Sequence, residues 1–298
     1  MKRMIFPGLF ILAFVIFTLI MGAILSAGTS SPPPDMRIAV VMYGNGNGDR
    51  WRSLELGIRQ ACRDLEIESP IIITPGEDRQ SGLIDREIAD GVDGLLIAPE
   101  NSEAQADSLE QLTFAIPIVF IMNGIESFSY VAADDAGMGR MLAEALSSRS
   151  GRILLIANHP PRKSAHLRVE AFLSYMAEAG VPVAPLDSLT AAAPGDIVVA
   201  LDTETLESAI DFFAESPGGI TLCGIGGSDK VVHALSQGIV DSVVFQNEYA
   251  MGYTATMALA EKLGIARPIP DMPIQYLYAD RKTMYEPDIA NLLFSIVQ

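Results

Sequence analysis

The feature that most constrains the fold is a regular alternation of short apolar runs and amphipathic stretches across residues 35–298. The apolar runs are rich in β-branched residues and continuously hydrophobic, which is typical of strands covered on both faces. Strands that alternate with helices indicate a parallel sheet wrapped by helices. The expected strands are residues 37–42, 71–73, 94–97, 118–122, 153–157, 197–201, 221–225 and 242–245.

The stretches between these runs have the three-and-four spacing of helices with one buried face. The first expected helix places Trp51, Leu54, Ile58, Ala61, Cys62 and Leu65 on that face, and a second follows Met138 to Leu146. Further helices are expected over residues 165–179 and 248–263, the latter stopped near Gly264. Because the βα order runs once before about Ala133 and once after it, the fold class is α/β with two similar lobes.

The chain begins with a long apolar segment. Lys2 and Arg3 are followed by no charged residue until Asp35. About 20 apolar helical residues cross the hydrocarbon core, and flanking cations favour the cytoplasmic side. We therefore expect residues 1–34 to be a single-pass transmembrane anchor with a Pro-rich spacer, and the remaining chain to lie on the extracytoplasmic side of the cell membrane. A cleaved signal peptide, whose apolar region usually has about 7–15 residues, is the alternative.

The composition excludes several partners. The formal net charge is −17, which argues against nucleic acid and anionic lipid surfaces. Cys62 and Cys223 are the only cysteines, and each lies in an apolar segment, so buried free thiols are expected in place of a disulfide framework. The three histidines have no metal-site spacing, and no cofactor is predicted.

Seven segments, in order, resemble the type I periplasmic binding proteins, the sugar-binding family that includes ribose-binding protein. They are IAVVMYGNGNGDRWRSLELGIRQA, DGVDGLLIAPENSEA, IPIVFIMN, YVAADDAGMGRMLAEAL, SAHLRVEAFLSYMAEAG, CGIGGSDKVVHAL and VVFQNEYAMGYTA. The resemblance spans nearly all of residues 36–280. It implies two Rossmann-like lobes with parallel sheets, joined by a three-segment hinge near residues 133–135, 246–247 and 274–277. The implied N-terminal lobe is residues 35–133 plus 247–275, and the C-terminal lobe is residues 134–246 plus 276–298.

In such a fold the ligand lies between the lobes, beyond the carboxyl ends of the strands. A sugar needs flat apolar surface and paired hydrogen-bonding groups. The residues expected to contact it are Asn45, Asn47, Asp49, Trp51, Glu100, Asn123, His166, Asp202 and Gln246. For Trp51 a core position is equally open, and the glycine-rich loop before it is as well explained by a flexible turn. Asp135 is expected to hold the hinge and to cap a helix that begins at Ala136.

Several residues that bind the sugar in members of the family are replaced in this chain. The Asp-Arg pair that ends the fourth strand in many members corresponds to Met122 and Asn123, and a family arginine corresponds to His166. The carboxylate of the family's G-F-D-G turn corresponds to Gly226. The segment between Val181 and Gly195 is short, which predicts that a helix usually found there is reduced.

These observations favour a membrane-anchored solute-binding protein that captures a small polar ligand, such as a sugar. It would deliver or report this ligand to an ABC importer permease or a sensor histidine kinase. The alternative is a ligand-free interaction module that acts as a protein partner of a membrane sensor kinase. The chain has no G-x-S-x-G, H-E-x-x-H or P-loop motif, so an enzyme is not predicted. A DNA-binding regulator would need a helix-turn-helix ahead of Met36, where this chain has its apolar segment.

Overall fold

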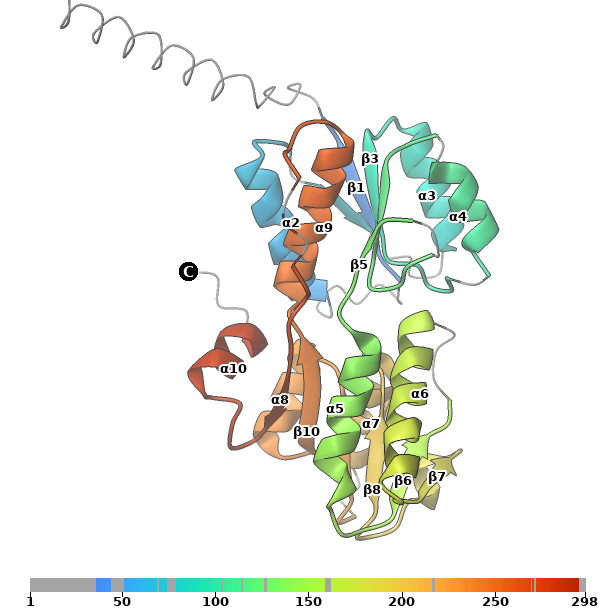
Figure 1. Ribbon diagram of the computed structural model, residues 1–298, viewed down its shortest axis with the longest axis vertical. Coiled ribbons are helices and arrows are strands. Elements are labelled where there is room, and N and C mark those ends of the chain that lie inside the picture. The colour runs from blue at the N-terminus through green and yellow to red at the C-terminus, as the bar shows by residue number, and fades with distance from the viewer. Residues whose placement is uncertain are drawn as a thin grey trace, which may run out of the picture.

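The computed structural model describes residues 36–43, 51–68, 70–73, 79–102, 104–113, 115–125, 128–158, 162–215, 218–268, 270 and 272–294. Two lobes follow one another along the long axis of the molecule (Figure 1). The predicted anchor and spacer over residues 1–34 lie outside the described residues. Within the described ranges, no helix combines the length and the hydrophobicity needed to cross a bilayer.

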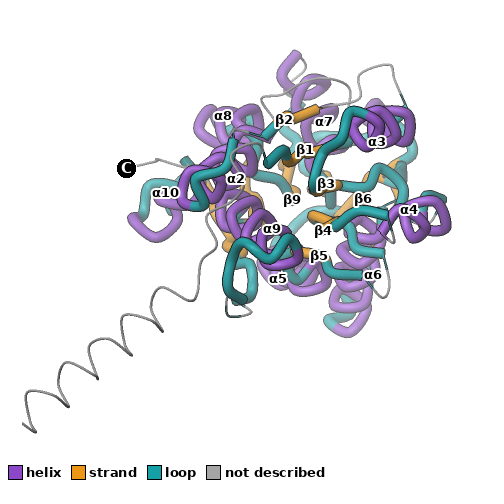
Figure 2. Tube along the Cα trace, turned by 90° about the horizontal axis from the view of Figure 1, so that it is seen from above, coloured by secondary structure: helices purple, strands orange, loops and turns teal. Residues whose placement is uncertain are grey.

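The upper lobe in Figure 1 contains a parallel sheet of order β2-β1-β3-β4-β5. Its strands are β1 (Ile38–Val41), β2 (Ile71–Ile73), β3 (Gly94–Ile97), β4 (Ile118–Ile121) and β5 (Tyr130–Val131). Helices α2 (Arg52–Asp64) and α9 (Glu248–Lys262) cover one face, and α3 (Gln80–Ala89) and α4 (Ala106–Thr113) cover the other (Figure 2). Strands β1, β3 and β4 are buried at every position, because helices cover both faces of the sheet.

The lower lobe contains a second sheet of order β11-β10-β9-β8-β6-β7. Its strands are β6 (Ile153–Ile156), β7 (Val183–Leu186), β8 (Ile197–Ala200), β9 (Thr221–Ile225), β10 (Val240–Gln246) and β11 (Tyr276–Asp280). Only the β10–β11 pair of this sheet is antiparallel. Helices α5 (Asp135–Ser147) and α6 (Lys163–Glu178) pack on one face of this sheet, and α7 (Thr203–Glu215) and α8 (Asp229–Gln237) pack on the other. Helix α10 (Pro287–Leu293) contributes Leu293 to the hydrophobic core on the side of α7 and α8.

Within the described residues, the chain passes between the lobes at three places. It crosses between β5 and α5, and again between β10 and α9, because α9 packs against α2, β3 and β4 of the upper lobe. The third crossing precedes β11, where Ile274 forms a parallel bridge with Ala133 and the N–H of Asn247 donates to the carbonyl of Gln275 at 2.8 Å. The crossing segments therefore lie side by side, while the lobe boundaries given above stay predictions.

Some elements differ from the sequence-based expectations. Strands over 71–73, 94–97 and 221–225 have the expected bounds, but β5, β7 and β11 are not among the predicted strands. Between β7 and β8 the chain forms only a short 3₁₀ turn (Leu189–Ala191), so the predicted reduction of a helix there is confirmed.

The cap of α5 corrects one prediction. The helix begins at Asp135 rather than at Ala136, and Asp134 is its N-cap. The Oδ1 atom of Asp134 accepts a hydrogen bond from the N–H of Gly137 at 2.9 Å. The proposed capping role of Asp135 is therefore wrong by one residue, because its carboxylate is instead directed to Arg168 inside the lobe.

The two cysteines are buried and free, as expected. Burial raises the pKa of the Cys62 and Cys223 thiols to about 11. Since the thiolate is the reacting species, we expect alkylation by iodoacetamide at about pH 8 to be slow in the native protein and fast in urea. Mass spectrometry of the alkylated protein measures both rates. Rapid labelling of both thiols in the native protein would contradict this assignment.

Candidate ligand-binding cleft

Side chains from both lobes converge at the carboxyl ends of the central strands. They surround a cavity of about 30 Å³, which is enough for a few water molecules at roughly 10–15 Å³ each. Its lining is Tyr43, Trp51, Met122, Arg162, Ser164, Ala165, Arg168, Asp202, Thr203, Glu204, Gln246 and Glu248. This position is the general ligand site of open α/β sheets.

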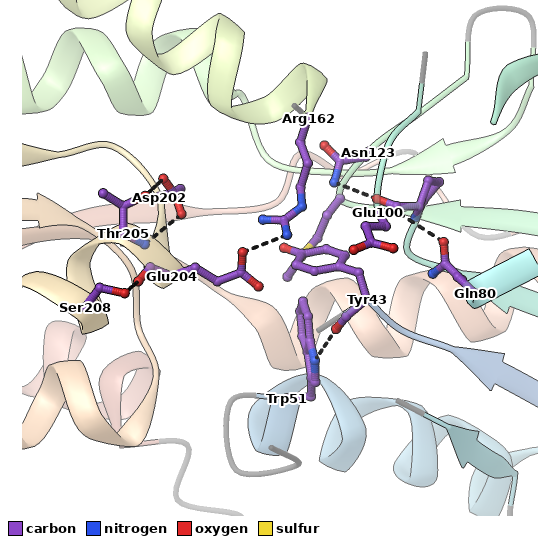
Figure 3. A network of polar contacts seen from close by, with 12 residues as sticks. Tyr43, Trp51, Gln80, Glu100, Asn123, Arg162, Asp202, Glu204, Thr205 and Ser208 are labelled. Atoms are coloured by element: carbon purple, nitrogen blue, oxygen red, sulfur yellow. Dashed lines mark hydrogen bonds and ion pairs between the residues drawn. The ribbon is translucent and has the colours of Figure 1, made fainter. Parts of the chain in front are cut away.

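The upper-lobe wall of the cavity is aromatic. Tyr43 lies two residues beyond β1, and Trp51 immediately precedes α2. Their ring centroids are 4.8 Å apart and their planes are at 88°. The indole Nε1 of Trp51 donates to the carbonyl of Tyr43 at 3.2 Å, which satisfies its polar atom (Figure 3). Trp51 is only 3% exposed and belongs to the hydrophobic core. It therefore lies in the core and also lines the cavity.

Arg162, at the N-cap of α6, reaches across the cavity. Its guanidinium lies 3.7 Å from the centroid of the Tyr43 ring, and Nη2 donates to Oε2 of Glu204 at 2.8 Å (Figure 3). The side chain is 7% exposed, and its Nε has no hydrogen-bond partner among the described residues. A buried cation with one unpaired donor therefore lines the cavity.

Asp202 and Gln246 form part of the lower-lobe wall. Asp202 follows β8 and is 5% exposed, and its carboxylate accepts hydrogen bonds from both the N–H and the hydroxyl of Thr205. These bonds fix the carboxylate at the start of α7, where acceptors for free N–H groups are favourable. Gln246 is the last residue of β10 and is half-buried. Both residues line the cavity, as the sequence predicts for ligand contacts.

The other predicted contacts are placed differently. Asn123 is 1% exposed beside the cavity, where its Oδ1 accepts from the N–H of Ser164 at 3.1 Å. Glu100 is exposed, and its N–H donates to Oε1 of Gln80 at 3.0 Å. Glu100 and the exposed His166 are not among the lining residues. Asn45, Asn47 and Asp49 lie outside the described residues.

Met122 links Asn123 to the end of β4 through an unusual backbone conformation. Its φ is +64°, a left-handed value that costs a non-glycine residue roughly 1–2 kcal/mol. Such strain persists where surrounding contacts determine it, and it is typical of functional sites. Here the Met122 N–H donates to the carbonyl of Val131 at 2.9 Å, and its sulfur accepts from the Tyr43 hydroxyl at 3.7 Å.

A buried ion pair lies at the wall of the cavity, where Arg168 is one of the lining residues. Arg168 of α6 donates through Nε to Oδ1 of Asp135 in α5 at 2.7 Å, and both side chains are 8% exposed. Burial raises the pKa of the Asp135 carboxyl, and the Arg168 cation opposes that rise. The pair joins two helices of the lower lobe, and it therefore holds that wall of the cavity in place.

The sequence did not single out Tyr43, Arg162 or Glu204 as site residues. Tyr43 could have been found, because it is the first aromatic residue beyond a predicted strand. Glu204 lies two residues beyond Asp202, near the same strand end. Arg162 gives no such signal, since it lies one helical turn before His166, the position that the resemblance indicates.

Comparisons with known proteins agree with this geometry. Residues 38–265 match the family described as periplasmic binding protein domain. One similar structure is a carbohydrate transporter solute-binding protein from Agrobacterium radiobacter in complex with D-arabinose, with 20% identity, a TM-score of 0.73, and coverage of 87% of this chain and 99% of that one. Another is an ABC transporter solute-binding protein from Agrobacterium vitis with bound D-fucose, with 18% identity, a TM-score of 0.73, and coverage of 86% and 99%.

A third similar structure, the XylFII–LytSN complex, has 15% identity, a TM-score of 0.68, and coverage of 84% of this chain and 99% of that one. A search of curated proteins gave no match. The low identities to the solved structures establish the fold alone. The family match covers most of the chain and confirms the resemblance found in the sequence. This chain belongs to the periplasmic binding protein domain family.

Proposed function

We propose that this protein is a membrane-anchored, extracytoplasmic solute-binding protein that captures a small polar ligand, in the first place a sugar, between its lobes. The observation that carries the proposal is the meeting of aromatic rings from the upper lobe with polar groups from the lower lobe. Tyr43 and Trp51 face Asp202 and Gln246 at the carboxyl ends of both sheets. This combination provides apolar surface for C–H faces and hydrogen-bonding groups for hydroxyls.

The size of the cavity implies that the lobes part to admit a ligand. About 30 Å³ holds a few water molecules but not a monosaccharide of roughly ten or more non-hydrogen atoms. Hinge closure about a few linking residues is a common motion of two-lobed binding proteins. The three crossing segments are the natural hinge, and Asp135 at the start of α5 adjoins the first of them.

The proposed partner is a membrane protein, either an ABC importer permease or a sensor histidine kinase. Anchoring through residues 1–34 would hold the lobes close to such a partner and raise its effective concentration. One similar structure, an ABC transporter solute-binding protein, supports the importer choice, and the XylFII–LytSN complex shows that a protein of this fold also occurs in a complex. The ligand would control the partner by changing how far the lobes are closed.

Trp51 gives a direct test, because it is the only tryptophan and lies against Tyr43 in the cleft. We expect its fluorescence to change saturably when the full chain in detergent is titrated with at least one of D-arabinose, D-fucose and D-allose. Binding at about 100 times Kd should add about 2.7 kcal/mol to the stability and raise the melting temperature. A flat response to all three sugars would contradict the assignment of a sugar ligand.

Two variants test whether the sugar binds in this cavity. Gln246→Leu should weaken binding by roughly 10-fold or more, because a hydrogen bond to the ligand is lost and its partner is left unpaired. His166→Ala should leave the affinity unchanged, because His166 does not line the cavity. If His166→Ala weakened binding and Gln246→Leu did not, the ligand would contact His166 and would not lie in this cavity.

A second function is favoured by one specific observation. The guanidinium of Arg162 lies 3.7 Å from the centroid of the Tyr43 ring, so the chain's own side chains occupy part of the cleft. A lobe pair that is closed in this way could serve as an interaction module for a membrane sensor kinase without any ligand. A flat fluorescence response, together with direct binding to a kinase sensor domain, would support this alternative.

A further inference from the structure

Among the described residues, two contacts between buried side chains or backbone groups join the lobes away from the crossing segments, and an exposed ion pair at 3.8 Å, Arg52 with Asp229, also joins them. The guanidinium of Arg162 lies 3.7 Å from the centroid of the Tyr43 ring, and the N–H of Ser164 donates to Oδ1 of Asn123 at 3.1 Å. Tyr43 and Asn123 follow strands β1 and β4 of the upper lobe, whereas Arg162 and Ser164 lie at the start of α6 in the lower lobe. Both contacts must break when the lobes part.

The contact between Arg162 and Tyr43 is formed by a buried cation held in place from its own lobe. Glu204 of α7 accepts a hydrogen bond from Nη2 at 2.8 Å, which directs the guanidinium at the ring. The Arg162 side chain is 7% exposed, so its cation–π contact lies in the desolvated range where such contacts are strongest. The guanidinium also occupies the ring face on which a ligand would stack.

The contact of Asn123 provides a helix cap from the other lobe. The first N–H groups of a helix lack partners within the helix, and Arg162 at the N-cap of α6 makes no capping hydrogen bond with its side chain. The Oδ1 atom of Asn123 supplies the missing acceptor, and its Nδ2 donates to the carbonyl of Pro99 at 3.4 Å. The left-handed backbone of Met122 places Asn123 for this role.

We propose that Arg162 and Asn123 form a latch that holds the lobes together through the chain's own side chains, and that a ligand reaching Tyr43 must displace Arg162. The latch stabilises the closed arrangement before any ligand is present. It goes beyond the proposed function, because it concerns the equilibrium between open and closed lobes in the protein itself.

The distance between spin labels on the two lobes tests the latch without a ligand. Gln111 on α4 and Ser174 on α6 are exposed. Helices α4 and α6 belong to opposite lobes and lie on the same side of the molecule (Figure 1). Nitroxides on cysteines at these positions, measured by double electron–electron resonance in the full chain in detergent, report the opening. The native cysteines are buried and stay unlabelled.

We expect one dominant short distance in the parent protein. Arg162→Met and Asn123→Ala should each raise the ratio of open to closed populations by about tenfold or more. Tyr43→Leu removes the same stacking contact from the other lobe, so it replaces Arg162→Met if that variant fails to fold. The matched control is Arg140→Met, because Arg140 lies 5.3 Å from the Tyr175 ring within the lower lobe and should not affect opening.

Unchanged distance distributions in the Arg162, Asn123 and Tyr43 variants would overturn the latch, and so would equal opening in Arg140→Met. These outcomes are independent of the proposed function, since no sugar takes part in the measurement. A protein that binds none of the three sugars can still show the latch, and one that binds a sugar can still lack it.

Discussion

Gly57→Val should lower the free energy of unfolding by more than about 4 kcal/mol or prevent the upper lobe from folding. Helices α2 and α9 pack with their backbones in contact. A Cβ atom on Gly57 would lie 2.0 Å from the carbonyl oxygen of Tyr249, and one on Gly252 would lie 2.2 Å from that of Leu54. No side-chain rotation relieves a clash with backbone, so the helices would have to separate and expose the core between them.

Urea unfolding followed by far-UV circular dichroism measures this loss. Gly82→Ala in α3 is the matched control, because a Cβ atom there meets nothing within 4 Å. That substitution should stabilise the protein by about 0.5–1 kcal/mol, since alanine restricts the unfolded chain. A Gly57→Val protein with the unfolding midpoint of the parent would show that α2 and α9 do not pack as described.

Arg168→Met should cost about 3–5 kcal/mol, because it leaves the buried carboxylate of Asp135 without its partner. The double variant Asp135→Asn, Arg168→Met should recover part of this loss, since no unpaired charge remains. Thermal unfolding of the parent, both single variants and the double variant gives the coupling between the two residues. A cost below about 1 kcal/mol for Arg168→Met would contradict the buried pair.

The same pair predicts a pH dependence. Burial raises the pKa of Asp135, so its contribution to stability is largest below its unfolded pKa and is lost as pH rises through the folded pKa. Removing Arg168 takes away the opposing effect and raises that pKa further. The penalty of Arg168→Met should therefore be smaller at about pH 4 than at pH 7, relative to the parent. The exposed Arg140→Met should show a change within about 0.5 kcal/mol at both pH values.

The central strands were predictable because their sequences allow few alternatives. The apolar runs over residues 94–97 and 221–225 lie inside their sheets and are almost wholly buried, and their bounds agree with the sequence. Three of the four edge strands lack this signal. Strand β5 has only two residues, β7 contains Pro185 and is only partly buried, and β11 is an antiparallel edge strand. Tertiary pairing, rather than local pattern, determines these strands.

The site was predictable where a residue follows its own strand. Asp202 and Gln246 line the cavity because β8 and β10 end there. Arg162 and Asn123 were not assigned their roles, because each depends on a partner in the other lobe. Asn123 was expected to contact a ligand, and in the structure its side-chain oxygen Oδ1 caps α6. Sequence patterns describe one element at a time and do not reveal contacts between lobes.

We propose that a single small ligand is held by both lobes at once. Hydrogen–deuterium exchange of the full chain, with and without saturating D-arabinose, D-fucose or D-allose, tests it directly. We expect at least one sugar to protect two segments together, the upper-lobe segment around Trp51 and the lower-lobe segment around Asp202. Protection of only one lobe by every sugar that binds, or of neither lobe by any of the three, would contradict it.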